Sequence, residues 1–133
     1  MKNLKKLGFS LIELMIVISI IGIITIFMIP SYKNYTERAR FMEVIIATEP
    51  YKLAISLAIQ QGIDLREINN NTVGISKESQ ETKNISSIKI HNGVITAIST
   101  PVAGNATLIL TPNDNGNIWS ISGTCKNAGL CNI

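Results

Sequence analysis

The side chain with the clearest chemical consequence is Glu13, a lone carboxylate inside the apolar stretch from Phe9 to Pro30. An acid inside a membrane-length helix costs about 2.5–3.5 kcal/mol at mid-bilayer, less near one end, and it therefore needs a partner. Cleavage after Gly8 would supply one, because the new α-amino group of Phe9 is cationic near neutral pH. Glu13 lies four residues beyond Phe9, and the terminus of a neighbouring chain would serve equally well. The expected chemistry is proteolytic processing followed by ion pairing.

Few other groups in the sequence point to chemistry. Two cysteines and one histidine, His91, are too small an inventory for an ordinary zinc site. We interpret His91 as a solvated residue at the end of a strand. No glycine-rich phosphate loop and no readable catalytic triad occurs. The sequence therefore predicts no enzyme, no metal and no cofactor.

The composition limits the choice of partners. The chain has 133 residues, which leaves room for one modest domain after the apolar stretch. Its net charge of +3 comes from the first eight residues, which contain Lys2, Lys5 and Lys6 and no acid. Beyond them, nine basic side chains balance nine acidic ones. A neutral remainder gives no case for nucleic-acid binding.

The apolar stretch is long enough to cross a membrane as a helix, which takes about 20 residues. Ordinary secretory signals have a shorter apolar stretch of about 7–15 residues, followed by small residues that suit cleavage. Here Gly8 instead precedes the stretch. An uncleaved signal anchor in which Glu13 is accidental is the alternative. Basic residues flank both sides of the apolar stretch, so their count does not give the orientation. We take it from the first eight residues and the cysteines, which place the N-terminus inside the cell and the remainder of the chain outside.

Residues 8–14, GFSLIEL, with the basic octapeptide before them and the apolar helix after them, resemble the N-terminus of type IV pilins. The leader length and Phe9 resemble the type IVa subclass. The resemblance is close over residues 5–35 and architectural beyond. It implies that residues 1–8 are a leader, that a membrane prepilin peptidase cuts between Gly8 and Phe9, and that the amino group of Phe9 is then methylated. It also implies that Glu13 supports assembly by complementing a neighbour's N-terminus.

The helix is predicted to continue well beyond the membrane. We expect a membrane and polymerisation half over 9–30 and an amphipathic half over 31–61, with kinks at Pro30 and Pro50. The segment 41–46 is expected to be ordinary core or a subunit contact. Beyond Pro50, the spacing predicts a solvent-exposed face formed by Lys52, Ser56 and Gln60. The opposite, buried side is expected to consist of Leu53, Ala54, Leu57 and Ala58.

The rest of the chain is predicted to form a head. Residues 62–84 are expected to be a connecting loop, and 85–133 an antiparallel sheet with a cysteine loop. Strands are expected over 85–91, 94–100, 106–111 and 117–122, with a hairpin at Asn92-Gly93. Cys125 and Cys131 are expected to form a disulfide outside the cell, with two free thiols as the alternative. The fold class is α+β: a long kinked helix on a four-stranded antiparallel sheet, as in type IV pilins.

The resemblance implies a structural subunit of a type IV pilus, a filament that serves adhesion, twitching motility and DNA uptake. Its partners are copies of itself, the prepilin peptidase and the assembly machinery of the inner membrane. A surface receptor is a further partner class. The expected location is the inner membrane as a single-pass prepilin, then the extracellular filament. The alternatives are a minor pilin or a type II secretion pseudopilin, and a DNA-binding competence pilin, which needs more basic residues than Lys77, Lys83, Lys89 and Lys126.

Overall fold

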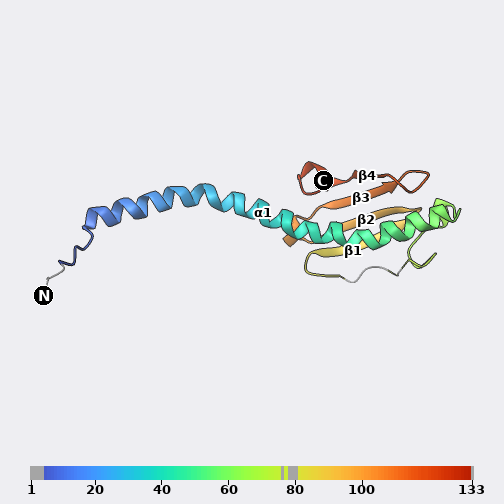
Figure 1. Ribbon diagram of the computed structural model, residues 1–133, viewed down its shortest axis with the longest axis horizontal. Helices are drawn as coiled ribbons and strands as arrows, with labels where there is room; N and C mark the ends of the chain where they lie inside the picture. The colour runs from blue at the N-terminus through green and yellow to red at the C-terminus, as the bar shows by residue number, and fades with distance from the viewer. Residues whose placement is uncertain (1–4, 76, 78–80, 133) are drawn as a thin grey trace. The chain divides into compact units, whose positions relative to one another are not determined.

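The computed structural model describes residues 5–75, 77 and 81–132, and it divides into two compact units, 1–34 and 35–133. Helix α1, Leu11–Gln60, contributes to both units (Figure 1). It is a single helix of 50 residues, close to the predicted span of 9–61. Pro30 and Pro50 both lie inside it without ending it. The kinks expected at these two prolines stay predictions.

The first unit contains the apolar half of α1. Every large apolar side chain from Leu11 to Ile29 is 50–77% exposed, so nothing within this unit covers them. The hydroxyls of this segment bond to the backbone one turn earlier: Ser19 Oγ donates to the Met15 carbonyl at 2.7 Å, and Thr25 Oγ1 to the Ile21 carbonyl at 2.6 Å. By length and composition, α1 is the one described helix that could cross a membrane.

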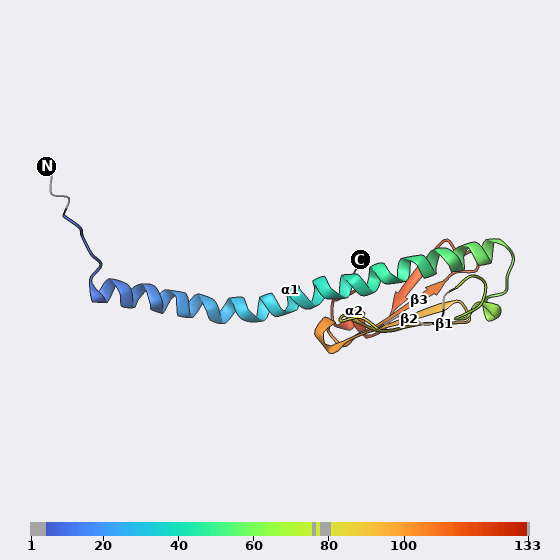
Figure 2. The same ribbon diagram turned by 90° about the horizontal axis from the view of Figure 1, so that it is seen from below.

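The second unit is a four-stranded antiparallel sheet with the second half of α1 packed on one face (Figure 2). The strands are β1 Ile85–His91, β2 Val94–Ser99, β3 Thr107–Pro112 and β4 Trp119–Ser122, and they are neighbours in sequence order. Short helical turns precede, interrupt and follow the sheet: η1 Leu65–Glu67, η2 Pro101–Ala103 and α2 Thr124–Asn127. The predicted α+β fold class and its four strands are confirmed.

The face of α1 that covers the sheet differs in part from the predicted one, since Ala58 is buried and Ala54 packs against the core as predicted. The covered residues alternate three and four apart, which is the spacing of one helix face: Phe41, Val44, Thr48, Tyr51, Ile55 and Ala58. Leu53 and Leu57, predicted to be buried, are 65% and 49% exposed. Lys52 and Ser56, predicted to face water, are partly covered. Thr48 fits the core because its hydroxyl donates to the Ile45 carbonyl at 2.6 Å.

The sheet contributes alternate side chains to the core, as its period of two requires. Ile88 and Ile90 of β1, and Leu108 and Leu110 of β3, are buried. The register shifts between Ile85 and Ser87, and this irregularity allows Ile85 also to be buried. Trp119 and Ile121 of β4 pack against the same core.

Two contacts fix the connecting segment 62–84 at its ends. Leu65 of η1 packs over the β1–β2 turn, where its Cδ2 lies 2.6 Å from the position that a Cβ on Gly93 would take. Gly93, with φ +76°, is therefore required both by the turn and by this close approach. At the other end, the Glu43 carboxylate accepts hydrogen bonds from Thr82 Oγ1 and from the side-chain amide of Asn84.

Candidate functional site

The first turn of α1 is closed by a reciprocal hydrogen-bonded pair. The Ser10 backbone N–H donates to Glu13 Oε2 at 2.7 Å, and Ser10 Oγ donates to the same oxygen at 3.0 Å. In return the Glu13 N–H donates to Ser10 Oγ at 3.3 Å. This arrangement is a capping box, in which a serine and a glutamate three residues later satisfy each other's backbone donors. It explains why the helix begins at Leu11.

The capping box adds a role to Glu13 that the sequence analysis missed. The signal was present, because Ser-x-x-Glu before an apolar run is the sequence signature of a capping box. Both bonds from Ser10 use Oε2, and among the described residues Oε1 accepts none. The predicted ion pair between Glu13 and a Phe9 amine stays a prediction, because in this chain the Phe9 nitrogen is bonded to Gly8.

The predicted cleavage point lies in an exposed, non-helical segment. Residues 5–10 are outside any helix or strand, and Phe9 is 91% exposed. A Cβ added to Gly8 would meet no heavy atom within 4 Å. The bond between Gly8 and Phe9 is therefore free of packing within the described chain, as a protease substrate needs. Its cleavage stays a prediction.

The predicted disulfide between Cys125 and Cys131 is confirmed. The sulfur atoms are bonded, the two Cα atoms are 5.4 Å apart, and both cysteines are buried. Inside the loop, the Leu130 N–H donates to the Cys125 carbonyl at 2.9 Å. A seven-residue closed loop stabilises the folded state by about 2.4 kcal/mol in the chain-entropy model. The disulfide thus holds the last described residues against the head.

A second apolar stripe on α1, the outer stripe, faces away from the sheet. It consists of Met42, Ile46, Leu53 and Leu57, which are 47–65% exposed. The spacing of these residues places them along one side of the helix, opposite the stripe that contains Phe41, Val44 and Ile55. The predicted segment 41–46 therefore divides: Phe41 and Ile45 are core, and Ile46 is exposed at 64%. Such an exposed apolar stripe is typical of a protein–protein contact.

Two family models match the chain. Residues 3–29 match the prokaryotic N-terminal methylation motif. Residues 37–131 match the model described as pilin, a bacterial filament protein. The first match contains the Ser10–Glu13 pair and most of the exposed apolar half of α1, and the second contains the head.

Similar proteins occur in Neisseria and in Escherichia coli. The chain is 39% identical over 99 residues to the type IV major pilin PilE of Neisseria gonorrhoeae, covering 73% of this chain and 58% of that protein. It is 33% identical over 127 residues to the fimbrial protein of Neisseria meningitidis serogroup B, covering 89% and 72%. It is 31% identical over 130 residues to prepilin peptidase-dependent protein D of Escherichia coli, covering 97% and 85%.

The fold agrees with a solved relative. The solution structure of the major type IV pilin PpdD from enterohemorrhagic Escherichia coli superposes with a TM-score of 0.53 at 20% identity, covering 68% of this chain and 70% of that one. At this identity the likeness concerns the fold alone. The match with the gonococcal pilin is also partial, since it spans 58% of that protein's length. The pilin model nevertheless covers most of the chain, from the second half of α1 to the disulfide loop, and the chain therefore belongs to the pilin family.

Proposed function

We propose that this chain is the structural subunit of a type IV pilus filament, held before assembly in the inner membrane as a single-pass prepilin. The observation that carries the proposal is the exposure of the first half of α1, where the apolar side chains from Leu11 to Ile29 are at least half exposed. Burying one such side chain stabilises a structure by about 1.5–3 kcal/mol. A segment of this kind therefore needs lipid around it, or copies of itself.

Processing prepares the subunit to exchange its lipid contacts for contacts with other copies. The prepilin peptidase cuts between Gly8 and Phe9 and methylates the new amine, as the match to the N-terminal methylation motif supports. The cut leaves two residues, Phe9 and Ser10, before the first helical residue. It removes three of the four lysines that precede Tyr35 and leaves one new cation at Phe9. The new charge then lies four residues before Glu13 in the sequence.

Glu13 sets the axial register of the assembled helices. Its carboxylate is tied to Ser10 through Oε2, which leaves Oε1 available to the Phe9 amine of a neighbouring subunit. Inside a bundle of helices that excludes water an unpaired carboxylate is costly. Axial registers that bring Glu13 to the Phe9 amine of a neighbour are therefore favoured. The capping box orients the carboxylate before the neighbour arrives, which lowers the entropic cost of pairing.

The outer stripe of α1 extends the subunit contact into the head. Met42, Ile46, Leu53 and Leu57 lie beyond the membrane half and stay exposed in a single chain. Packing against apolar helices of neighbouring subunits would cover them. The heads then form the outer shell of the filament, on which adhesion, twitching motility and DNA uptake depend.

The test is the location and abundance of the chain. In cells that make it, shearing should release filaments whose main protein is this chain, and deletion of its gene should abolish them. A trace amount in the filaments would identify a minor pilin. Retention of all of the chain in the envelope of a secreting cell would identify a pseudopilin. Normal sheared filaments in the deletion strain would contradict the proposed role.

A DNA-binding competence pilin is a weaker alternative. Its candidate residues Lys77, Lys83, Lys89 and Lys126 are exposed. They come from the connecting segment, β1 and α2 and not from one helix or strand. Eight acidic side chains also balance the eight basic ones from Tyr35 onward. DNA retention that disappears on removing these lysines while filaments persist would support this alternative.

A further inference from the structure

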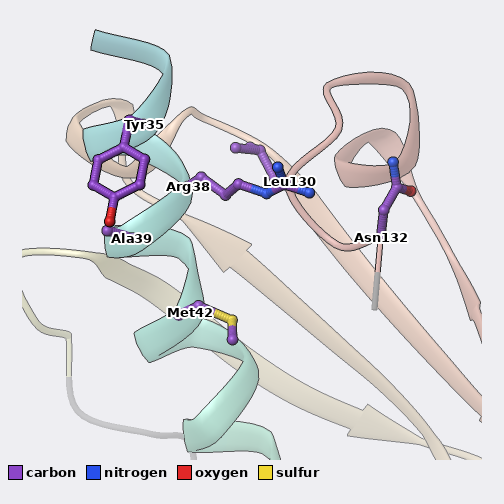
Figure 3. A pocket seen from close by; sticks show the side chains of 6 residues that line it. All are labelled: Tyr35, Arg38, Ala39, Met42, Leu130 and Asn132. Carbon is purple, nitrogen blue, oxygen red and sulfur yellow. The ribbon is translucent and has the colours of Figure 1, made fainter. Parts of the chain in front are cut away.

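A hollow of about 230 Å³ lies in the head between the start of its helix and the disulfide loop (Figure 3). It is lined by Tyr35, Arg38, Ala39 and Met42 of α1, by Leu130 of the loop, and by Asn132 just after the loop. Four of these six side chains present mainly carbon to the hollow, and Arg38 supplies a cation at its side. Met42 is 47% exposed and Tyr35 75%, so the hollow is open to a ligand.

An apolar side chain projects from another part of the same head. Ile118, in the β3–β4 connection, is 68% exposed, the largest exposure among the described valine, leucine and isoleucine side chains of this unit. The connection is held firmly, because Asn113 Oδ1 accepts from the N–H groups of Asn117 and Ile118 at 2.9 and 3.1 Å. The Asn113 N–H also donates to the Ile118 carbonyl at 2.9 Å. Ile118 is thus presented to solvent by an ordered turn.

The turn is also hydrogen-bonded to α1, at Ser56. Ser56 Oγ donates to the Gly116 carbonyl at 2.8 Å, and a Cβ on Gly116 would lie 3.3 Å from the Ser56 Cα. Ala39, in the wall of the hollow, precedes Ser56 by 17 positions in the same helix. At 1.5 Å per residue this separation is about 26 Å. The projecting side chain and the hollow therefore lie towards opposite ends of one head, and one copy cannot join them.

The charges around the two features are complementary. Asp114 belongs to the same turn as Ile118, and it is exposed. It is the single acidic side chain between residues 82 and 133. The hollow is lined by a side chain of opposite charge, the guanidinium of Arg38. An aliphatic side chain with a neighbouring carboxylate fits an apolar hollow with a neighbouring guanidinium.

We propose that Ile118 of one subunit packs into the hollow at Tyr35, Ala39 and Leu130 of another, with Asp114 facing Arg38. This inference rests on the proposed function, because it needs copies of the chain in a filament. The contact joins two different patches, so it is heterologous, and its repetition gives an open helical polymer when the rotation between copies does not close a ring. It is also continuous with the outer stripe of α1, because Met42 belongs to both.

The test introduces one cysteine on each side of the contact. The native cysteines are paired, and no free thiol occurs among the described residues. Ile118→Cys and Ala39→Cys replace exposed side chains, so both should be tolerated. Oxidation of sheared filaments carrying both should give a ladder of disulfide-linked chains longer than dimers. Each single variant should give no ladder.

Val102→Cys combined with Ala39→Cys is the matched control, because Val102 of η2 is also apolar and 46% exposed. Intact filaments in which the Ile118 pair gives no more cross-linking than the Val102 pair would overturn this contact and leave the proposed function standing. Absence of filaments from the unaltered chain would instead count against the proposed function.

Charge reversal gives a second, independent readout. Asp114→Arg should lower the yield of sheared filaments at least tenfold, and adding Arg38→Asp should restore most of it. Lys126→Asp is the control second change, because Lys126 does not line the hollow. Restoration by Arg38→Asp but not by Lys126→Asp supports the contact. Equal yields in all of these variants would overturn it.

Discussion

Ser10 and Glu13 bond to each other's backbone at the start of α1: the Ser10 N–H lies 2.7 Å from Glu13 Oε2, and the Glu13 N–H lies 3.3 Å from Ser10 Oγ. Glu13 therefore already has a partner in the single chain. In the proposed filament the same carboxylate also meets a neighbour's Phe9 amine. The two roles make different demands, because capping needs an acceptor oxygen and ion pairing needs a negative charge.

Glu13→Gln separates these two roles. Glutamine keeps an acceptor for the Ser10 N–H, so the helix start should persist and membrane insertion should be unchanged. The charge is lost, and the yield of sheared filaments should fall by at least tenfold. Ser10→Ala is the counterpart: it removes a cap worth about 0.5–2 kcal/mol but keeps the charge, so filaments should still form. Normal filament yield from Glu13→Gln would refute the pairing.

Gly8→Phe should block processing. The structure leaves space for a side chain at this position, so the change should not disturb the chain itself. The expected result is a precursor eight residues longer than the mature subunit on immunoblots, with no sheared filaments. Leu7→Ala, at the exposed neighbouring position, should be processed normally. Mature-sized protein from Gly8→Phe would contradict the predicted cut after Gly8, because it would show that processing does not need this glycine.

Ile55→Ala and Leu53→Ala test which face of α1 covers the sheet. Ile55 is fully buried, so its truncation should lower the free energy of unfolding by about 2–5 kcal/mol. Leu53 is 65% exposed, so its truncation should change the free energy by less than about 0.5 kcal/mol. Thermal unfolding of the detergent-solubilised chain, followed by the fluorescence of Trp119, measures both. Similar losses from the two variants would contradict the observed orientation.

Leu53→Ala should affect assembly although it spares the fold. If the outer stripe of α1 is covered by neighbouring subunits, this variant should give fewer or more easily sheared filaments. Lys83→Ala, also on the surface of the head, is a suitable control. Filament yield and resistance to shear indistinguishable from those of the control would argue against the stripe as a subunit contact.

Replacing both Cys125 and Cys131 by alanine should destabilise the head without abolishing the sheet. The two cysteines close a short loop, for which a loss of about 2–4 kcal/mol is typical. The expected observation is a lower unfolding midpoint of the head, monitored by the fluorescence of Trp119. Reduction of the unaltered chain should give the same shift. A midpoint that does not move would mean that packing alone holds residues 125–131.

The fold was largely predictable because its signals are local. The strands show alternating apolar residues, and Asn92-Gly93 supplies the residues that a tight hairpin turn favours. The covered face of α1 was predicted only at Ala54 and Ala58. Thr48 and Tyr51 are weakly apolar by type, whereas the exposed Leu53 and Leu57 are strongly apolar. Residue type alone does not distinguish a stripe that meets the chain's own sheet from one that meets another copy.

The site was partly predictable for a similar reason. Glu13 and Gly8 stand out because each breaks the pattern of its surroundings. The capping role of Ser10 was not predicted, although Ser10 and Glu13 have the spacing of a capping box. The hollow beside Ala39 could not be found from sequence, since Leu130 and Asn132 approach α1 only after the sheet and the disulfide have formed.

The central claim is that the apolar half of α1 exchanges lipid for copies of itself. A photoreactive amino acid at Ile20, midway along that half and 52% exposed, tests it directly. In sheared filaments, irradiation should link chains to one another through this position. In the uncut Gly8→Phe precursor it should give lipid adducts and no linked chains. Filaments in which Ile20 yields no links between chains would contradict the account.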